Sequence, residues 1–568
     1  MRRQPPRTER DEIDLYIRTY YSLLRSTGDV RVRAFEEAHI GSESSLHAGA
    51  GDPRPDVAAF AYSAARLPEC MHAVTRLVLG QSVEHFEMAR LSVRGWKRVD
   101  TRGRRRALRW DERETLAVFI TSASDVDDLI PIVTCYQLEW NKMHELLVDA
   151  GIRDGSLAEV AEALGLEDED LDRLCAALGS DWAAVLPQIA LRRCDFRVRL
   201  LYGSFAQYQR SAHRWWSEIE PFYLRSDTAR RPVYFVSSNT HSFTNLLGGY
   251  AREHRDAILS FARQRDPEAL ARPLEEALEA GDEAGASNIL YYLLRGFLHE
   301  GDGAPRVGLE EVQDFDRESG IRSIASPGRI DVGAQLFELS QLKPERLDPR
   351  VRVAGADLLS QSEAVIVNID YPLGLAAYHH FSRIAQGIGE LRGMYVMGKA
   401  ATLNARVGDV LIPKSVYDEH SENSYLFRNC FSAEDVQPYM REGTVLDNQK
   451  AVTVRSAFLQ NRDYMSIYYN RGYTILEMEA GPYLSAVYEV VSPKRHPEDE
   501  IVHMSTMIPF DVGFIHYASD TPYSRRQHLL SKSLSYFGVE STYGASIAIL
   551  RRILESEVAR LASPRQPV

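Results

Sequence analysis

The spacing of hydrophobic residues divides the chain into two regions that meet near residue 230. In the first region, apolar residues recur every three or four positions over residues 12–26, 72–93 and 126–151, a spacing typical of amphipathic helices. Such a helix buries its apolar face and leaves its polar face in water. The pattern therefore predicts a mostly α-helical domain over residues 1–230.

One arginine-rich segment interrupts the helical pattern. Residues 92–110 combine apolar and basic residues around a Thr-Arg-Gly sequence at 101–103, which predicts a β-hairpin. A run of like charges is usually solvated, because burying unpaired charge costs free energy. We therefore expect this hairpin to be exposed.

After residue 230, strands and helices alternate. Residues 232–238 and 363–369 are short apolar runs of the kind found in strands that are covered on both faces. Residues 251–300 return to helical spacing and predict a helical insertion. The alternation predicts an α/β domain with a central, mixed sheet over residues 231–568.

Composition narrows the class of protein. The chain has 568 residues, a net charge of −13 and a pI near 5.7, so we expect no general binding to nucleic acid. The five cysteines show no paired spacing, which indicates neither a disulfide framework nor a structural zinc site. A charged N-terminus and the lack of a long apolar run predict no secretory signal and no membrane span, and hence a cytoplasmic protein.

Several segments of the second region follow one another in a known order. They read VNIDYPLGLAAYHHFSRI (367–384), YVMGKAATLNARVGDVLIP (395–413), LEMEAGPYLSAVYE (476–489) and IHYASDTPYSRRQHLL (515–530). This order resembles the nucleoside phosphorylase/nucleosidase superfamily, which includes purine nucleoside phosphorylase, methylthioadenosine/adenosylhomocysteine nucleosidase and AMP nucleosidase. The resemblance implies a three-layer α/β domain that cleaves an N-glycosidic bond, and it says nothing of the first 230 residues.

Two glutamates at the end of an apolar strand are the first candidate site residues. The resemblance implies that Glu479 accepts hydrogen bonds from ribose hydroxyls, that Met478 packs on the ribose and that Glu477 supports both. An anionic group at this place would stabilise the positive charge that develops on the sugar during cleavage. The alternative is a solvated strand end, with Glu479 in the first turn of a helix.

An aspartate after a second strand is the candidate general acid. The resemblance implies that Asp520 protonates the leaving purine at N7 and that Ser519 orients it. A general acid that works near neutral pH needs a raised pKa, which desolvation at the end of an apolar strand would supply. The alternative is that Asp520 caps a following helix.

The chain departs from the family where phosphorylases bind phosphate. Val396 stands where these enzymes carry an arginine, and residues 237–242 read SSNTHS in place of a Gly-Asp-rich loop. Gly398 and Ala400 are closer to the hydrolytic branch, so we expect water rather than phosphate as the nucleophile. Lys399 is unusual in this turn, and we consider a contact with the 5′-phosphate of a nucleotide or, alternatively, an ordinary surface lysine.

Further candidates lie in three loops. Ser238, Asn239 and His241 would supply donors to a 5′ group, or they form an ordinary capped loop. Asp370 and Gly374 sit in the turn after a central strand, where Asp370 would position the attacking water or simply form the turn. The aromatic residue Phe427, or its neighbour Tyr425, would stack on the base, or both belong to the core.

The sequence thus leads to an enzyme that cleaves the N-glycosidic bond of a purine nucleoside or nucleotide, by hydrolysis rather than phosphorolysis. Its expected partner is that small molecule, with phosphate as a further candidate ligand, and the resemblance implies a homo-oligomer. We expect no metal and no organic cofactor. The alternative is a non-catalytic protein that binds or senses nucleotides on the same fold.

Overall fold

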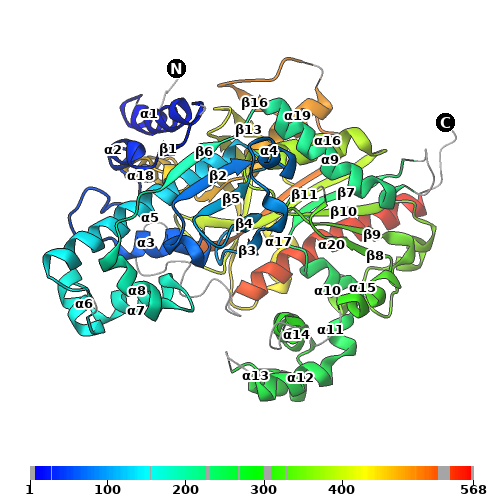
Figure 1. The fold of residues 1–568 in the computed structure, drawn as a ribbon. Helices are drawn as coiled ribbons and strands as arrows, with labels where there is room; N and C mark the ends of the chain where they lie inside the picture. Colours follow the sequence, from blue (N-terminus) through cyan, green and yellow to red (C-terminus); the bar gives the residue numbers. More distant parts are fainter. Residues whose placement is uncertain are drawn as a thin grey trace.

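The structure, a computed structural model, describes residues 7–26, 28–153, 155–201, 203–224, 230–265, 269–299, 309–327, 330–492, 494–521 and 538–563. The strands form two separate sheets, one of six strands and one of eleven. We refer to residues 7–224 as the N-terminal module and to residues 230–563 as the C-terminal module. Figure 1 shows the two modules side by side, with the smaller sheet facing the larger one.

The N-terminal module surrounds its six-stranded sheet with helices. The helices are α1 (Arg7–Leu24), α2 (Arg33–Gly41), α3 (Val57–Ala64), α4 (Val83–Met88), α5 (Ala123–Asp149), α6 (Leu157–Leu164), α7 (Asp168–Leu178), α8 (Trp182–Leu191) and α9 (Phe205–Tyr223). The strands are β1 (Val30–Arg31), β2 (Arg76–Gly80), β3 (Lys97–Val99), β4 (Leu108–Trp110), β5 (Thr115–Phe119) and β6 (Arg197–Leu200). Their order is β1-β6-β2-β5-β4-β3, and β6, β2 and β5 run parallel.

The sequence predicted the helical content of this module better than its sheet. The helices expected over residues 12–26 and 126–151 are present as α1 and α5, and β3 and β4 form the expected antiparallel hairpin. The single helix expected over residues 72–93 was wrong, because its first half is β2. Leu77, Val78 and Leu79 are all fully buried, so this apolar run is covered on both faces rather than on one.

The C-terminal module contains the larger sheet. Its strands are β7 (Val233–Ser238), β8 (Ile321–Ile324), β9 (Ala334–Glu338), β10 (Val365–Asp370), β11 (Leu391–Thr402), β12 (Val410–Asp418), β13 (Ser424–Leu426), β14 (Val445–Thr453), β15 (Ile475–Glu477), β16 (Ile501–His503) and β17 (Asp511–Asp520). Its helices are α10 (Ser242–Gly248), α11 (Tyr250–Glu253), α12 (Arg255–Gln264), α13 (Ala271–Glu279), α14 (Glu283–His299), α15 (Leu309–Arg317), α16 (Leu375–Gly387), α17 (Ala433–Val436), α18 (Arg462–Asn470), α19 (Ala480–Val491) and α20 (Val539–Ala562).

This sheet is mixed and partly closed. Strands β10, β7, β11 and β17 run parallel, whereas β9 is antiparallel to β10 and β15 is antiparallel to β11. Strand β17 pairs with both β11 and β12, and the pairings β12–β14, β14–β15 and β15–β11 complete a closed ring of five strands. Closure leaves no free edge within the ring.

Helices cover both faces of this sheet. One hydrophobic core joins one face to α10–α14 and α20, and another joins the opposite face to α9, α16 and α19. The three-layer α/β fold expected for the second region is therefore confirmed, as is the helical insertion over residues 251–300, which forms α11–α14.

Helix α9 connects the two modules. Tyr208, near its start, belongs to the N-terminal core, whereas Trp215 and Trp216 are fully buried in the C-terminal core. Trp215 also donates a hydrogen bond of 2.8 Å to the backbone oxygen of Val332. The change from one core to the other thus falls within α9, before the boundary at residue 230 that the sequence pattern indicates.

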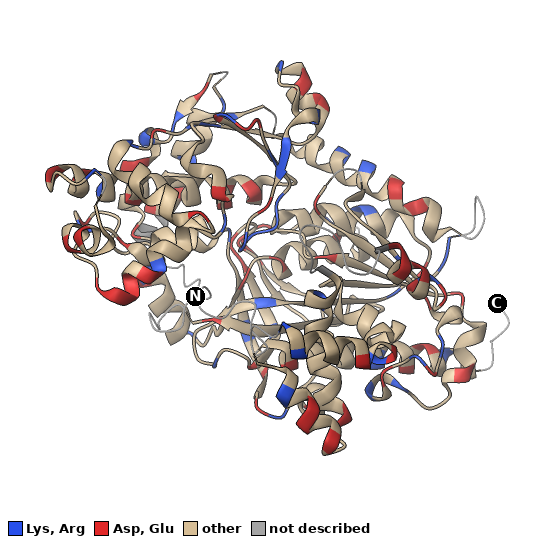
Figure 2. Cartoon of the chain, turned by 60° about the horizontal axis from the view of Figure 1, so that its bottom comes forward, with Lys and Arg blue, Asp and Glu red and all other residues tan. Residues whose placement is uncertain are grey.

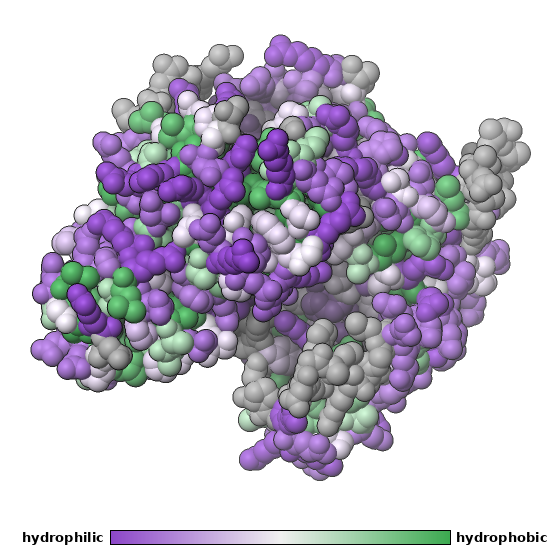
Figure 3. Space-filling model, viewed as in Figure 1, coloured by the Kyte–Doolittle hydropathy of each residue, from purple (hydrophilic) through white to green (hydrophobic). Residues whose placement is uncertain are grey.

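The surface is charged and mixed. Figure 2 shows Lys and Arg interspersed with Asp and Glu along the helices of both modules, and Figure 3 shows hydrophilic residues over most of one face. Among the described helices, none is by itself long and apolar enough to cross a membrane, although α7 and α8, bent by 99°, satisfy the same criteria as a pair.

Candidate active site

The candidate residues gather at one edge of the larger sheet. The parallel strands β7 and β10 end side by side, with Ser238 opposite Asp370. On β11, Ala401 lies opposite Asp520 of β17 and, on its other side, opposite Leu476 of β15. Glutamates 477 and 479 therefore follow a strand next to β11, on the side away from Asp520. In open α/β sheets, ligands bind outside the carboxyl ends of the strands.

Glu477 is buried and organises the start of α19. One carboxylate oxygen accepts hydrogen bonds of 2.7 Å from the backbone N–H of Glu479 and 2.6 Å from that of Ala480, and the other accepts one from the hydroxyl of Thr453. Burial and the neighbouring charge of Glu479 raise the pKa of Glu477 to about 8. These bonds fit the expected supporting role of Glu477.

Glu479 lies where the two modules meet, near Gly374 of one and Arg104 of the other. Its carboxylate accepts a long hydrogen bond of 3.4 Å from the backbone N–H of Gly374, at the start of α16. Burial raises its pKa to about 7, while that N–H and the charge of Arg104 act in the opposite direction. Met478 is half-buried beside it. The carboxylate thus has room to accept further hydrogen bonds.

Asp520 ends β17 and faces the N-terminal module. It is 9% exposed, its carboxylate accepts a hydrogen bond of 2.8 Å from the backbone N–H of Thr521, and it interacts electrostatically with Tyr62 and Arg66. A bulge shifts the register at this point, and Ser519 donates to the backbone oxygen of Ala400 at 3.4 Å rather than to Asp520.

Lys399 and His241 are further candidates, and both have lowered pKa values. Lys399 is at an exposed position of β11. Desolvation of its ammonium group by surrounding atoms and the positive charges of Arg66 and Arg295 lower its pKa. Burial, Arg295 and Lys399 lower the pKa of His241 to about 4, so its ring is neutral at pH 7. Gly398 meets only ordinary contacts, since a side-chain carbon there would lie 3.8 Å from the ring of Tyr371.

The loop after β7 is an ordinary capped turn. The side-chain oxygen of Asn239 accepts hydrogen bonds from the backbone N–H groups of His241 and Ser242 at 3.0 and 2.7 Å. Ser238 is fully buried and donates to the side-chain oxygen of Asn368 at 2.8 Å. Ser238 and the side-chain oxygen of Asn239 are thus engaged within the protein, whereas the buried amide nitrogen of Asn239 has no hydrogen-bond partner among the described residues.

Two further candidates are held by the protein. Asp370 forms an ion pair with Arg105 of the N-terminal module, so its carboxylate is turned toward that guanidinium. Phe427 is 5% exposed and packs edge-on against Phe514, with ring centroids 5.3 Å apart, and Tyr425 is fully buried. Their burial fits core aromatics rather than rings that stack on a ligand.

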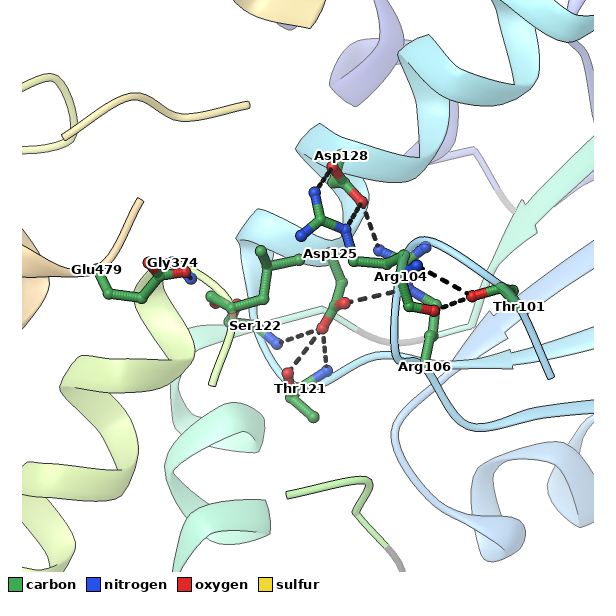
Figure 4. Close-up of polar contacts among 10 residues, drawn as sticks. Thr101, Arg104, Arg106, Thr121, Ser122, Asp125, Asp128, Gly374 and Glu479 are labelled. Atoms are coloured by element: carbon green, nitrogen blue, oxygen red, sulfur yellow. Dashed lines mark hydrogen bonds and ion pairs between the residues drawn. The ribbon is translucent and has the colours of Figure 1, made fainter. Parts of the chain in front are cut away.

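The sequence analysis missed the contribution of the N-terminal module. Arg104 forms a two-pronged ion pair with Asp128 of α5, at 3.0 and 2.8 Å, and interacts electrostatically with Glu479. Arg106 bridges Asp128 and Asp125 at 3.0 and 3.2 Å, and its side chain is only 2% exposed. Figure 4 shows these groups beside Glu479 and Gly374.

These arginines belong to the segment that we expected to be an exposed hairpin. The hairpin itself is present, but that expectation was wrong for Arg104 and Arg106, which point inward because α5 offers them carboxylates. The signal for these residues that the sequence offered was the arginine-rich run itself. That run does not indicate that Asp125 and Asp128, about 20 residues later, supply buried carboxylate partners.

Two cavities lie between the modules. One has about 450 Å³ of empty space, and its walls include Gln81, Arg106 and Tyr371; the other, of about 460 Å³, has walls that include Asp14 and Glu419. Within the described ranges, neither of these cavities is lined by Glu479 or Asp520. The described residues also contain no group of three or more His, Cys, Asp or Glu side chains arranged to hold a metal ion.

Fold and site together define a two-module α/β protein with buried carboxylates near the strand ends of its larger sheet. Residues 32–555 match the family of unknown function DUF6909, and the chain belongs to this family. A comparison with curated protein sequences finds no match.

Solved structures that resemble the chain align with less than half of it. They include 5′-methylthioadenosine/S-adenosylhomocysteine nucleosidase from S. pneumoniae (12% identity, 43% of this chain and 94% of that chain, TM-score 0.27). A protein from Weissella paramesenteroides assigned as a methylthioadenosine nucleosidase aligns at 10% identity over 41% and 89%, with a TM-score of 0.27. A methylthioadenosine phosphorylase from an antarctic soil metagenomic library aligns at 10% over 34% and 72%, with a TM-score of 0.25. At these TM-scores, the likeness carries no argument about activity.

Proposed function

We propose that this protein cleaves the N-glycosidic bond of a purine nucleoside or nucleotide, by hydrolysis rather than phosphorolysis. The observation that carries the proposal is the placement of Asp520 at the end of β17 and of Glu479 two residues after β15, the two strands that flank β11 at Ala401. A sugar bound over Ala400 and Ala401 would meet one carboxylate on each side. That is the arrangement an N-glycosidase needs, with one group at the ribose and one at the base.

Each carboxylate has a separate task in this reaction. Glu479 accepts hydrogen bonds from the ribose hydroxyls and stabilises the positive charge that builds on the sugar ring as the C1′–N bond breaks. Asp520 donates a proton to the leaving purine as the C1′–N bond breaks, and water supplies the oxygen that bonds to C1′. That water loses one proton to solvent, and Asp520 takes up a proton in turn, so the step balances. Glu477 fixes the backbone of Glu479 through the two N–H bonds described above, so it acts as a positioning residue.

The valine at position 396 favours hydrolysis over phosphorolysis. A buried valine, 3% exposed, occupies the place where the phosphorylases of the resembling superfamily carry an arginine, and it has no group to hold free phosphate. In the loop after β7, the backbone N–H groups of His241 and Ser242 donate to the side-chain oxygen of Asn239.

The test is release of free base. The purified protein is incubated with adenosine, guanosine, inosine and their 5′-monophosphates, with and without added phosphate, and free base is quantified by chromatography. We expect release from at least one of these compounds without phosphate, reduced at least 100-fold in Asp520→Asn and in Glu479→Gln. Release that persists in both variants, or that requires phosphate, would contradict the proposal.

A non-catalytic nucleotide-binding protein is the second candidate. The ion pair between Asp370 and Arg105 favours it, since this carboxylate is then engaged by the protein rather than by an attacking water. This candidate predicts that a nucleotide raises the melting temperature of the protein while no free base appears over many hours.

A further inference from the structure

The cavity beside α1 lies between the modules and has no part in the proposed reaction. It has about 460 Å³ of empty space, and its walls include neither Glu479 nor Asp520 among the described residues. One wall is α1 of the N-terminal module, and the other walls come from the C-terminal module. Small-molecule sites in proteins typically have volumes of about 300–1,000 Å³ and combine apolar walls with a few polar groups.

Charged groups of both signs line this cavity. They are Asp14 of α1, Glu419, which directly follows β12, and Arg455, two residues after β14. The guanidinium of Arg455 lies 4.0 Å from the carboxylate of Asp14, and its Nε donates a hydrogen bond of 3.2 Å to the backbone oxygen of Glu419. Three charged side chains from the two modules thus stand around one space.

Arg455 keeps most of its capacity to donate hydrogen bonds. Its side chain is 25% exposed, and its two terminal nitrogens donate no hydrogen bond to any residue that the structure describes. At 4.0 Å, the contact with Asp14 is an ion pair that is too long for a hydrogen bond. A guanidinium binds a carboxylate most strongly through two parallel N–H donors. The terminal nitrogens of Arg455 are therefore available to the carboxylate of a ligand.

Glu419 is a carboxylate without an ion-pair partner among the described residues. It accepts hydrogen bonds of 3.1 Å from the backbone N–H of Arg455 and 3.0 Å from the hydroxyl of Tyr468. The amide of Gln460 donates a third, of 3.1 Å. Burial raises the pKa of Glu419, and a cation beside it would lower that pKa again. An ammonium group in the cavity would therefore be attracted by both Glu419 and Asp14.

The other walls are apolar and aromatic. Tyr464 and Tyr468 of α18 line the cavity with their ring centroids 5.7 Å apart, and Ile13, Ile17 and Leu459 add aliphatic surface. Such walls favour an apolar or aromatic group, because contact with them removes apolar surface from water.

We propose that this cavity binds a free α-amino acid with an apolar or aromatic side chain. Arg455 binds the α-carboxylate, and Asp14 and Glu419 bind the α-ammonium group. The side chain of the ligand packs on the aromatic and aliphatic walls. A zwitterion satisfies charged groups of both signs without adding net charge to a partly buried space. Because α1 and the C-terminal module share the site, the ligand would also link the two modules.

The test compares matched ligands by isothermal titration calorimetry on the full chain. L-phenylalanine is compared with 2-phenylethylamine, which lacks the carboxylate, and with 3-phenylpropanoate, which lacks the ammonium group. L-leucine is compared with 3-methylbutylamine and 4-methylpentanoate in the same way. We expect at least one of the two amino acids to bind about tenfold more tightly, or better, than each of its own analogues.

Two variants separate the two ends of the ligand. Arg455→Gln should remove the preference for the amino acid over the amine and leave the preference over the carboxylate. Asp14→Asn should reduce the preference over the carboxylate and leave the preference over the amine. A general loss of folding cannot produce these opposite changes. The controls Arg462→Gln and Asp463→Asn, at exposed positions of α18, should change neither preference.

Three results would overturn the proposal. They are no binding of any probe at millimolar concentration, an amine or a carboxylate that binds as tightly as its amino acid, and variants that weaken all probes equally. The proposed reaction is decided separately by the release of base. Amino-acid binding without base release would leave this site standing and exclude the nucleosidase, and base release without amino-acid binding would do the reverse.

Discussion

Ser124 of the N-terminal module lies directly against Gly374 of the C-terminal module. A side-chain carbon at Gly374 would be 2.3 Å from the hydroxyl oxygen of Ser124, and the backbone N–H of Leu375 donates to that oxygen at 2.9 Å. The N-terminal ends of α5 and α16 therefore meet within one residue of the N–H that Glu479 accepts. Docking of the modules and placement of the candidate site share this contact.

A side chain at position 374 should disrupt this contact. Gly374 has φ +54, and Gly374→Ala combines backbone strain with the clash against Ser124, so we expect it to lower the free energy of unfolding by about 2–4 kcal/mol. Gly472→Ala is the matched control, because Gly472 has φ +76 but no heavy atom within 4 Å; it should cost about 1 kcal/mol. Urea unfolding measures both, and equal losses would refute the steric argument.

Removing Arg104 should leave a buried charge undercompensated. Asp128 is 1% exposed and would keep only Arg106 among its ion pairs, so we expect Arg104→Gln to lower the free energy of unfolding by about 2–4 kcal/mol. The exposed Arg98, paired with Asp100 at 3.6 Å, provides the comparison, since Arg98→Gln should change stability by less than about 0.5 kcal/mol. A similar small effect for both would mean that Asp128 does not need Arg104.

Stability should fall as the pH rises through the range in which Glu477 ionises. The pKa of Glu477 is about 8 in the folded state and 4.5 in the unfolded state. Between pH 4.5 and pH 8, the folded state therefore binds more protons than the unfolded state. In Glu477→Gln, the decrease in the free energy of unfolding between pH 5 and pH 8 should be smaller than in the wild type by on the order of 1–3 kcal/mol. Melting temperatures across this range test the slope, with the exposed Glu442→Gln as control. An unchanged slope in Glu477→Gln would show that Glu477 ionises normally.

Base release should depend on ionisation of Glu479. Its carboxylate must be charged to stabilise the sugar cation, and its pKa is raised to about 7, so kcat/KM should rise about tenfold per pH unit below 7 and bend near pH 7. At higher pH, kcat/KM should fall again where Asp520 loses the proton that it donates. Because the charge of Arg104 lowers this pKa, Arg104→Gln should move the bend to higher pH. A bend below pH 5 in the wild type would show that the pKa of Glu479 is not raised in the free enzyme.

Much of the C-terminal module could be predicted from the sequence. Strands β7 and β10 read as short apolar runs, and the order of segments around Glu479 and Asp520 indicated a site formed by strand ends. Local periodicity carries this information because a strand or helix reveals its buried faces in its own residues. The same logic failed at Leu77–Leu79, where a strand buried on both faces resembles the apolar side of a helix.

The sequence by itself determined two regions of different pattern, an acidic chain, and carboxylates placed where strands end. Only the tertiary structure decided that Arg104 and Arg106 turn inward and that Arg105 pairs with Asp370. The physical reason is that the environment of a charged side chain depends on partners brought together by folding, over separations of up to some hundreds of residues. The sequence near each arginine contains no record of those partners.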